Sequence, residues 1–141
     1  MNLSSLFSRG GALAVAALVA GVGLSGTAQA GAKGANNVYV SASSRVAQGD
    51  LGQARSTADS TQFLGCYTQS YRNASGAFEQ VNCQARDTAG VYYSCWATEP
   101  ELVRAARAIS GDSFLFFAGD AAGKCTSILV DQSSLYQPKQ P

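Results

Sequence analysis

The stretch that decides the fold is residues 79–97, EQVNCQARDTAGVYYSCWA, where two runs of β-forming residues flank Asp87-Thr88-Ala89-Gly90. An Asp-x-x-Gly connection suits a tight hairpin, because Asp can bond the backbone two residues on and Gly adopts positive φ without cost. The same pattern recurs in residues 113–131, SFLFFAGDAAGKCTSILVD, around Asp120 and Gly123. We therefore expect two antiparallel hairpins.

A helix is expected between the two hairpins. Thr98-Glu99-Pro100-Glu101 matches a capping box with Thr98 as N-cap, and Pro100 falls in the first turn, where its missing N–H is harmless. Gly111 is a natural stop. Four apolar residues between these limits repeat at helical spacing: Leu102, Ala105, Ala106 and Ile109.

The segment before the first hairpin has weaker signals. Residues 38–43 and 62–70 are predicted to be strands, and residues 44–60 are predicted to be mostly loop. Residues 71–77 are predicted to be a turn, because Asn73 and Gly76 are turn-forming residues. The order strand, strand, hairpin, helix, hairpin predicts an α+β domain. In it, a small antiparallel sheet of about five strands packs against one helix.

The first thirty residues are expected to be a cleaved secretory signal peptide. A polar start with Arg9 precedes the apolar run GALAVAALVAGVGL (11–24), and Ala28 and Ala30 form the A-x-A pattern of a cleavage site. An uncleaved anchor is the alternative, but spanning needs about 20 apolar residues. We expect a partly flexible segment at 31–60, a disulfide-stabilised domain at 61–131 and an extended tail at 132–141.

Four cysteines in a short exported chain predict two disulfides. If Asp87 pairs with Val91, then Cys83 lies opposite Cys95, which makes the pairing Cys83–Cys95 with Cys66–Cys125 possible by distance. The competing pairing, Cys66–Cys83 with Cys95–Cys125, ties the first strand to the hairpin and is the one we favour. The spacings fit neither a zinc site nor a redox C-x-x-C motif.

Charge and composition exclude several classes of function. The 141 residues hold ten basic and nine acidic side chains, and loss of Arg9 with the signal peptide leaves nine of each. This balance offers no field to attract nucleic acid. Histidine is absent from the sequence, so Ser-His-Asp and Cys-His catalysis and histidine-ligated metals are ruled out. We expect no cofactor and no metal.

Aromatic residues mark the candidate binding site. Tyr92 and Trp96 share one face of a strand while Tyr93 takes the other, so one set must leave the core. The alternative is ordinary sheet packing, since aromatic residues favour strands. The expected binding residues are Tyr67, Tyr92, Trp96, Arg72 and Arg86.

These observations predict a small exported, disulfide-stabilised binding protein without catalysis, periplasmic or extracellular, that acts on an envelope or extracellular macromolecule. The partner is expected to be a protein or a glycan, and the alternative function is a carbohydrate-binding module using the Tyr/Trp face. An envelope enzyme using carboxylates such as Glu99 and Glu101 is a third hypothesis. We expect no membrane span after cleavage, and the sequence does not determine the oligomeric state.

Overall fold

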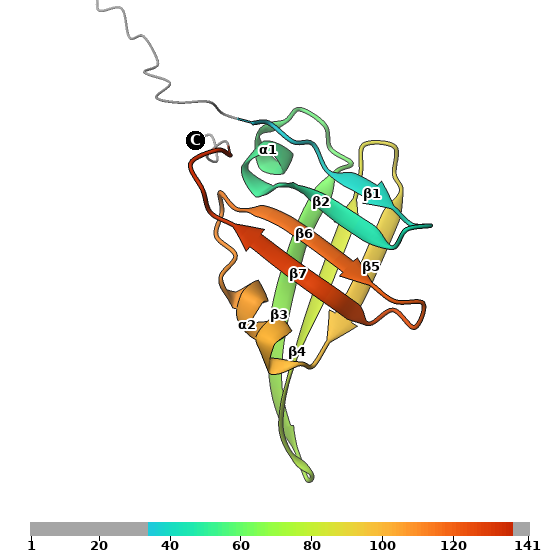
Figure 1. Ribbon diagram of the computed structural model, residues 1–141, viewed down its shortest axis with the longest axis vertical. Coiled ribbons are helices and arrows are strands. Elements are labelled where there is room, and N and C mark those ends of the chain that lie inside the picture. Colours follow the sequence, from blue (N-terminus) through green and yellow to red (C-terminus); the bar gives the residue numbers. More distant parts are fainter. Residues whose placement is uncertain (1–33, 137–141) are drawn as a thin grey trace, which may run out of the picture.

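The computed structural model describes residues 34–136, so the expected signal peptide and the end of the tail lie outside the described residues. Seven strands form two antiparallel sheets that face each other (Figure 1). One sheet has the order β1-β2-β6-β7, with β1 at Tyr39–Ser41, β2 at Val46–Asp50, β6 at Phe114–Gly119 and β7 at Cys125–Asp131. The other has the order β3-β4-β5, with β3 at Phe63–Asn73, β4 at Gly76–Arg86 and β5 at Tyr92–Ala97.

The fold is the small disulfide-stabilised α+β domain expected from the sequence, but with more elements. Residues 34–136 form seven strands in two sheets rather than about five in one, and two helices, α1 at Leu51–Ser56 and α2 at Pro100–Arg107. The expectation of mostly loop at residues 44–60 is wrong, because β2 and α1 lie there. The sequence of β2, VAQGD, lacks a strand pattern and is extended because it pairs along its whole length with β6.

Both Asp-x-x-Gly hairpins are confirmed as β4–β5 and β6–β7. Gly90 and Gly123 adopt φ values of 85° and 78°, as the turns require. The Asp87 carboxylate accepts a hydrogen bond from the Val91 N–H at 2.9 Å, and the Asp120 carboxylate accepts one from the Lys124 N–H at 2.9 Å. The turn chemistry therefore works as the sequence predicts.

The hairpin β3–β4 is longer than expected. The prediction of a turn over residues 71–77 is wrong, because Tyr71 and Phe78 are cross-strand partners and strand pairing continues to Asn73 opposite Gly76. The far part of this hairpin projects beyond the two packed sheets (Figure 1). We call residues 68–79 the arm; all of them are exposed.

Helix α2 starts one residue later than the capping box predicts. Its N-cap is Glu99 rather than Thr98, and no side-chain hydrogen bond caps it. The Glu99 carboxylate instead accepts a hydrogen bond from the Thr98 N–H at 3.0 Å. Pro100 does occupy the first turn, as predicted, and Ala106 contributes to the core.

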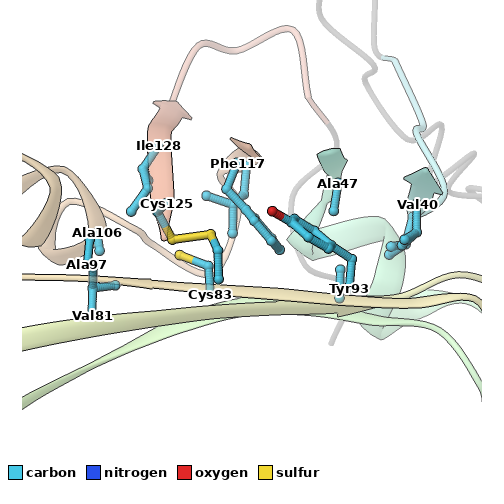
Figure 2. Close-up of a cluster of buried hydrophobic side chains, with 14 of the residues drawn as sticks. Val40, Ala47, Val81, Cys83, Tyr93, Ala97, Ala106, Phe117, Cys125 and Ile128 are labelled. Carbon is cyan, nitrogen blue, oxygen red and sulfur yellow. A yellow bond between two sulfur atoms is a disulfide. The ribbon is translucent and has the colours of Figure 1, made fainter. Parts of the chain in front are cut away.

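The core lies between the two sheets, where alternate residues of each strand point inward (Figure 2). In β5 the burial alternates strictly, with Tyr93, Cys95 and Ala97 buried. The Tyr93 ring stacks on Phe117 of the opposite sheet, with ring centroids 5.8 Å apart. This contact joins the two layers near their centre.

The disulfides are Cys66–Cys83 and Cys95–Cys125, which confirms the favoured pairing. Cys83 and Cys95 do lie opposite each other in register, yet each bonds a different partner. Cys66–Cys83 links two neighbouring strands of one sheet, whereas Cys95–Cys125 links the two sheets. Two disulfides indicate that the chain matures in an oxidising compartment, as exported proteins do. Within residues 34–136, no helix combines the length and the apolar character needed to cross a membrane.

Candidate binding face on the three-stranded sheet

The outer face of β3–β4–β5 carries an unusual number of exposed aromatic rings. Because one set of alternate residues fills the core, the other set must face solvent. Tyr92 and Trp96 are 45% and 39% exposed, and Tyr67 is 52% exposed. We call this surface the aromatic face; its rings are Phe63, Tyr67, Tyr71, Phe78, Tyr92 and Trp96.

Strand register arranges the aromatic face in rows that run across the sheet. Rows with aromatic rings alternate with rows of glycine, amide and hydroxyl side chains. From the β4–β5 turn toward the arm, the rows are Phe63 with Arg86 and Tyr92; Gly65 with Gln84 and Ser94; Tyr67 with Asn82 and Trp96; Gln69 with Gln80; and Tyr71 with Phe78. Successive aromatic rows are four residues apart, or about 13 Å at ~3.3 Å per residue, so the three rows span roughly 26 Å.

Two cations border these rings and hold them in place. The Arg86 guanidinium lies 5.5 Å from the centroid of Phe63 and 5.8 Å from that of Tyr92. The Lys124 ammonium, from the β6–β7 turn, lies 5.2 Å from the Trp96 ring centroid. Cation–π attraction of this kind contributes about 0.5–1 kcal/mol at exposed sites. The rings at both ends of β5 are therefore partly preorganised.

A shallow, solvent-open notch interrupts the aromatic face at Gly65. It is lined by Phe63, Leu64, Gly65, Cys66, Tyr67 and Gln84. A Cβ added at Gly65 would have no heavy atom within 4 Å, so the missing side chain leaves open space between the flanking aromatic residues. Beside the notch, the Tyr92 hydroxyl donates a hydrogen bond to Oε1 of Gln84 at 3.3 Å.

Four of the five predicted site residues lie on this face: Tyr67, Tyr92, Trp96 and Arg86. The fifth, Arg72, belongs to the alternate set of β3, opposite Ala77, and so projects from the other side of the arm. Whether any of them binds a ligand stays a prediction.

Several members of the aromatic face were not among the expected binding residues; Tyr71 was seen only as part of the aromatic cluster of the sequence. Phe63 and Tyr71 lie four residues before and after Tyr67, and this spacing in one predicted strand was the available signal. Phe78 and Gln84 join the face only because the β3–β4 register sets them opposite Tyr71 and Gly65. Gly65 carried no signal of its own.

The other candidate groups are occupied in structural contacts. The carboxylates of Asp87 and Asp120 cap their turns, as the Asp-x-x-Gly pattern predicts. No cluster of three or more metal-ligating side chains occurs among the described residues. The fully buried Asp50 uses one oxygen to accept hydrogen bonds from the backbone and side chain of Asn36, and burial raises the pKa of this carboxyl.

The four-stranded sheet has a different outer surface. One row across it contains Tyr39, Gln48, Phe116 and Leu129. Tyr39 is 55% exposed and makes no ring or cation contact with another described residue. It is a natural control for the exposed tyrosines of the aromatic face.

Comparison with protein-family models, with curated proteins and with solved structures finds no match to this chain. Its function must therefore be inferred from the chemistry of its own surface.

Proposed function

We propose that this protein is an exported, non-catalytic binding protein whose aromatic face holds an extended macromolecule. Of the two partner classes expected from the sequence, protein and glycan, we propose a polysaccharide. The observation that carries this proposal is the alternation of aromatic rows with rows of uncharged polar side chains.

The size and openness of the aromatic face favour a polymer. Its three aromatic rows extend over roughly 26 Å of an open sheet, which is longer than a drug-sized ligand in a closed pocket requires. Exposed aromatic surface on a small domain is unfavourable in water and is typical of interaction sites. A chain lying along the strands would cover one ring after another.

The chemistry of the rows favours a sugar chain. The face of an aromatic ring is electron-rich and attracts the polarised C–H groups of a pyranose. The amides of Gln69, Gln80, Asn82 and Gln84 can each donate and accept hydrogen bonds, which matches hydroxyl groups that do the same. Binding to nucleic acid would call for a continuous positive groove, whereas Arg86 and Lys124 are the only cations described at this face.

We place the protein in the periplasm or outside the cell. The two disulfides and the predicted signal peptide support this location. Release of residues 1–30 is tested by sequencing the amino terminus of exported material, which should begin at Gly31. A mature protein that still begins at Met1 would contradict the predicted cleavage.

Binding is tested with immobilised neutral polysaccharides and their soluble hexasaccharides, in affinity electrophoresis and calorimetry. The variants Trp96→Ala and Tyr67→Ala should each weaken binding at least about tenfold, equivalent to ~1.4 kcal/mol. Tyr39→Ala, which removes an exposed tyrosine from the other sheet, should have no effect.

Three results would argue against this proposal. The first is that the wild type retains no polysaccharide, and the second is that Tyr39→Ala and Trp96→Ala bind the polysaccharide with equal affinity. The third is that a purified exported protein displaces the polysaccharide from the aromatic face. Chromatography of the bound polymer before and after incubation tests the absence of catalysis. If shorter polysaccharide chains appear with time, the protein cleaves the polymer and is an enzyme.

A further inference from the structure

We propose that the notch at Gly65 is a subsite for one uncharged pyranose unit, and that Gln84 is its specificity-determining side chain. This inference rests on the proposed function and assigns one part of the aromatic face a distinct role. It joins three observations: an unfilled position between two aromatic residues, an amide whose orientation is held, and an uncharged lining.

The notch is open because of a single residue. On β3 the outward positions run Phe63, Gly65, Tyr67, so a glycine separates two aromatic side chains whose Cα atoms are about 13 Å apart along the strand. Any other residue at position 65 would place its side chain in the open space above the strand. Glycine in a strand interior weakens the strand and often marks a place of close approach by a ligand. The backbone at Gly65 thus forms a floor on which a flat ring can rest.

The amide of Gln84 is held in one orientation beside this floor. The Tyr92 hydroxyl donates to Oε1 of Gln84, so the two N–H groups on Nε2 remain as donors. Gly65 and Gln84 are cross-strand partners, which places the amide within reach of a ligand in the notch. A ring hydroxyl that accepts from Nε2 would therefore be distinguished from its epimer.

The lining explains why the unit should be uncharged. Among the residues that line the notch, only the phenol of Tyr67 can ionise, because Cys66 is disulfide-bonded. The Arg86 guanidinium in the next row lies over the rings of Phe63 and Tyr92. A carboxylate in the notch would lose hydration and gain only amide donors.

The test uses the mature chain and three hexasaccharide probes, derived from cellulose, β-mannan and β-galactan, which differ in the configuration of ring hydroxyls. Gly65→Val places a branched side chain in the notch, where its Cβ would have no heavy atom within 4 Å apart from its chain neighbours, and valine favours strands. We expect its thermal midpoint to be equal to or above that of the wild type, while its affinity for the preferred hexasaccharide falls at least tenfold. Thr68→Val, on the other side of the same strand, is the matched control and should retain full affinity.

Tyr92→Phe tests the role of Gln84. This variant keeps the ring and removes only the hydroxyl that orients the amide. We expect the ratio of affinities for the best and second-best hexasaccharides to fall by at least threefold. An unchanged ratio would show that the orientation of Gln84 does not set specificity.

The outcomes separate this inference from the proposed function. If Trp96→Ala abolishes binding but Gly65→Val does not, the notch is not a subsite and the aromatic face remains a glycan surface. If the wild type binds only carboxylated polysaccharides and loses them in Arg86→Gln, the uncharged subsite is refuted. If the wild type binds no hexasaccharide and no polysaccharide, both proposals fail.

Discussion

The disulfide between Cys95 and Cys125 is the covalent link between the two sheets, and its removal tests how the sandwich is held together. The perturbation is the double variant Cys95→Ala/Cys125→Ala. Both residues are almost fully buried, with 2% and 5% of their surface exposed, so the lost sulfur atoms leave a defect inside the core. The variant should remain folded but be markedly less stable.

The expected loss follows from the length of chain that the bridge closes. The two cysteines are 30 residues apart, and constraining a loop of that length in the unfolded chain contributes about 3.6 kcal/mol by the loop-entropy relation. The Cys66–Cys83 bridge closes 17 residues and contributes about 3.1 kcal/mol. A domain of this size has a total stability of roughly 5–15 kcal/mol. Removing both bridges should therefore leave much of the chain unfolded at 37 °C.

The assay is urea unfolding, followed in parallel by far-ultraviolet circular dichroism and by the fluorescence of Trp96, the single tryptophan. We expect a lower midpoint for each double variant and a larger m-value, because an uncrosslinked unfolded chain exposes more surface. Cys66→Ala/Cys83→Ala is the matched control, since it removes a bridge within one sheet. A loss below about 1 kcal/mol in Cys95→Ala/Cys125→Ala, or a loss smaller than in the control, would refute this reasoning.

Three further predictions concern buried groups. Gly119→Ala should cost about 1–3 kcal/mol in urea unfolding, because its Cβ would lie 2.7 Å from the Lys124 carbonyl oxygen and would overlap the Tyr93 hydroxyl; wild-type stability would contradict this packing. Tyr93→Phe should equal or exceed the wild type in thermal midpoint, since its buried hydroxyl has no hydrogen-bond partner among the described residues, and a drop of several degrees would reveal one. Burial raises the pKa of the Asp50 carboxyl in the folded state, so the folded protein holds the carboxyl proton more tightly than the unfolded chain does. The free energy of unfolding therefore declines as pH rises through the folded-state pKa. Asp50→Asn removes that titration, so its stability relative to the wild type should increase from about pH 4 to pH 7 in urea unfolding; a constant difference would exclude the effect.

Local sequence chemistry accounts for the parts of the fold that were predicted. Asp87 and Gly90 specify their turn through one carboxylate and one positive φ, which are contacts among neighbours in the chain. The capping box at Thr98 failed, although it is also a local signal, because the Glu99 carboxylate accepts from the Thr98 N–H and the helix begins at Pro100.

The candidate site was partly accessible from sequence. Alternation along β5 correctly separates the exposed Tyr92 and Trp96 from the buried Tyr93. The face on which Arg72 lies could not be predicted, because residues 71–77 were expected to form a turn, in which alternation does not apply. The notch depends on register between β3 and β4, which brings Gln84 beside Gly65 from 19 positions away.

The sequence by itself determined the hairpins, the disulfide-stabilised α+β class and the alternation that exposes half of the aromatic residues, because each depends on residues close along the chain. Only the tertiary structure decided that β2, a segment without strand character, pairs with β6 to build a second sheet. It also decided which of two feasible disulfide pairings forms, since Cys83 lies directly between Cys66 and Cys95 in the sheet. Cys95 bonds Cys125 because the core brings the two sheets together at that point, and no spacing in the sequence encodes that contact.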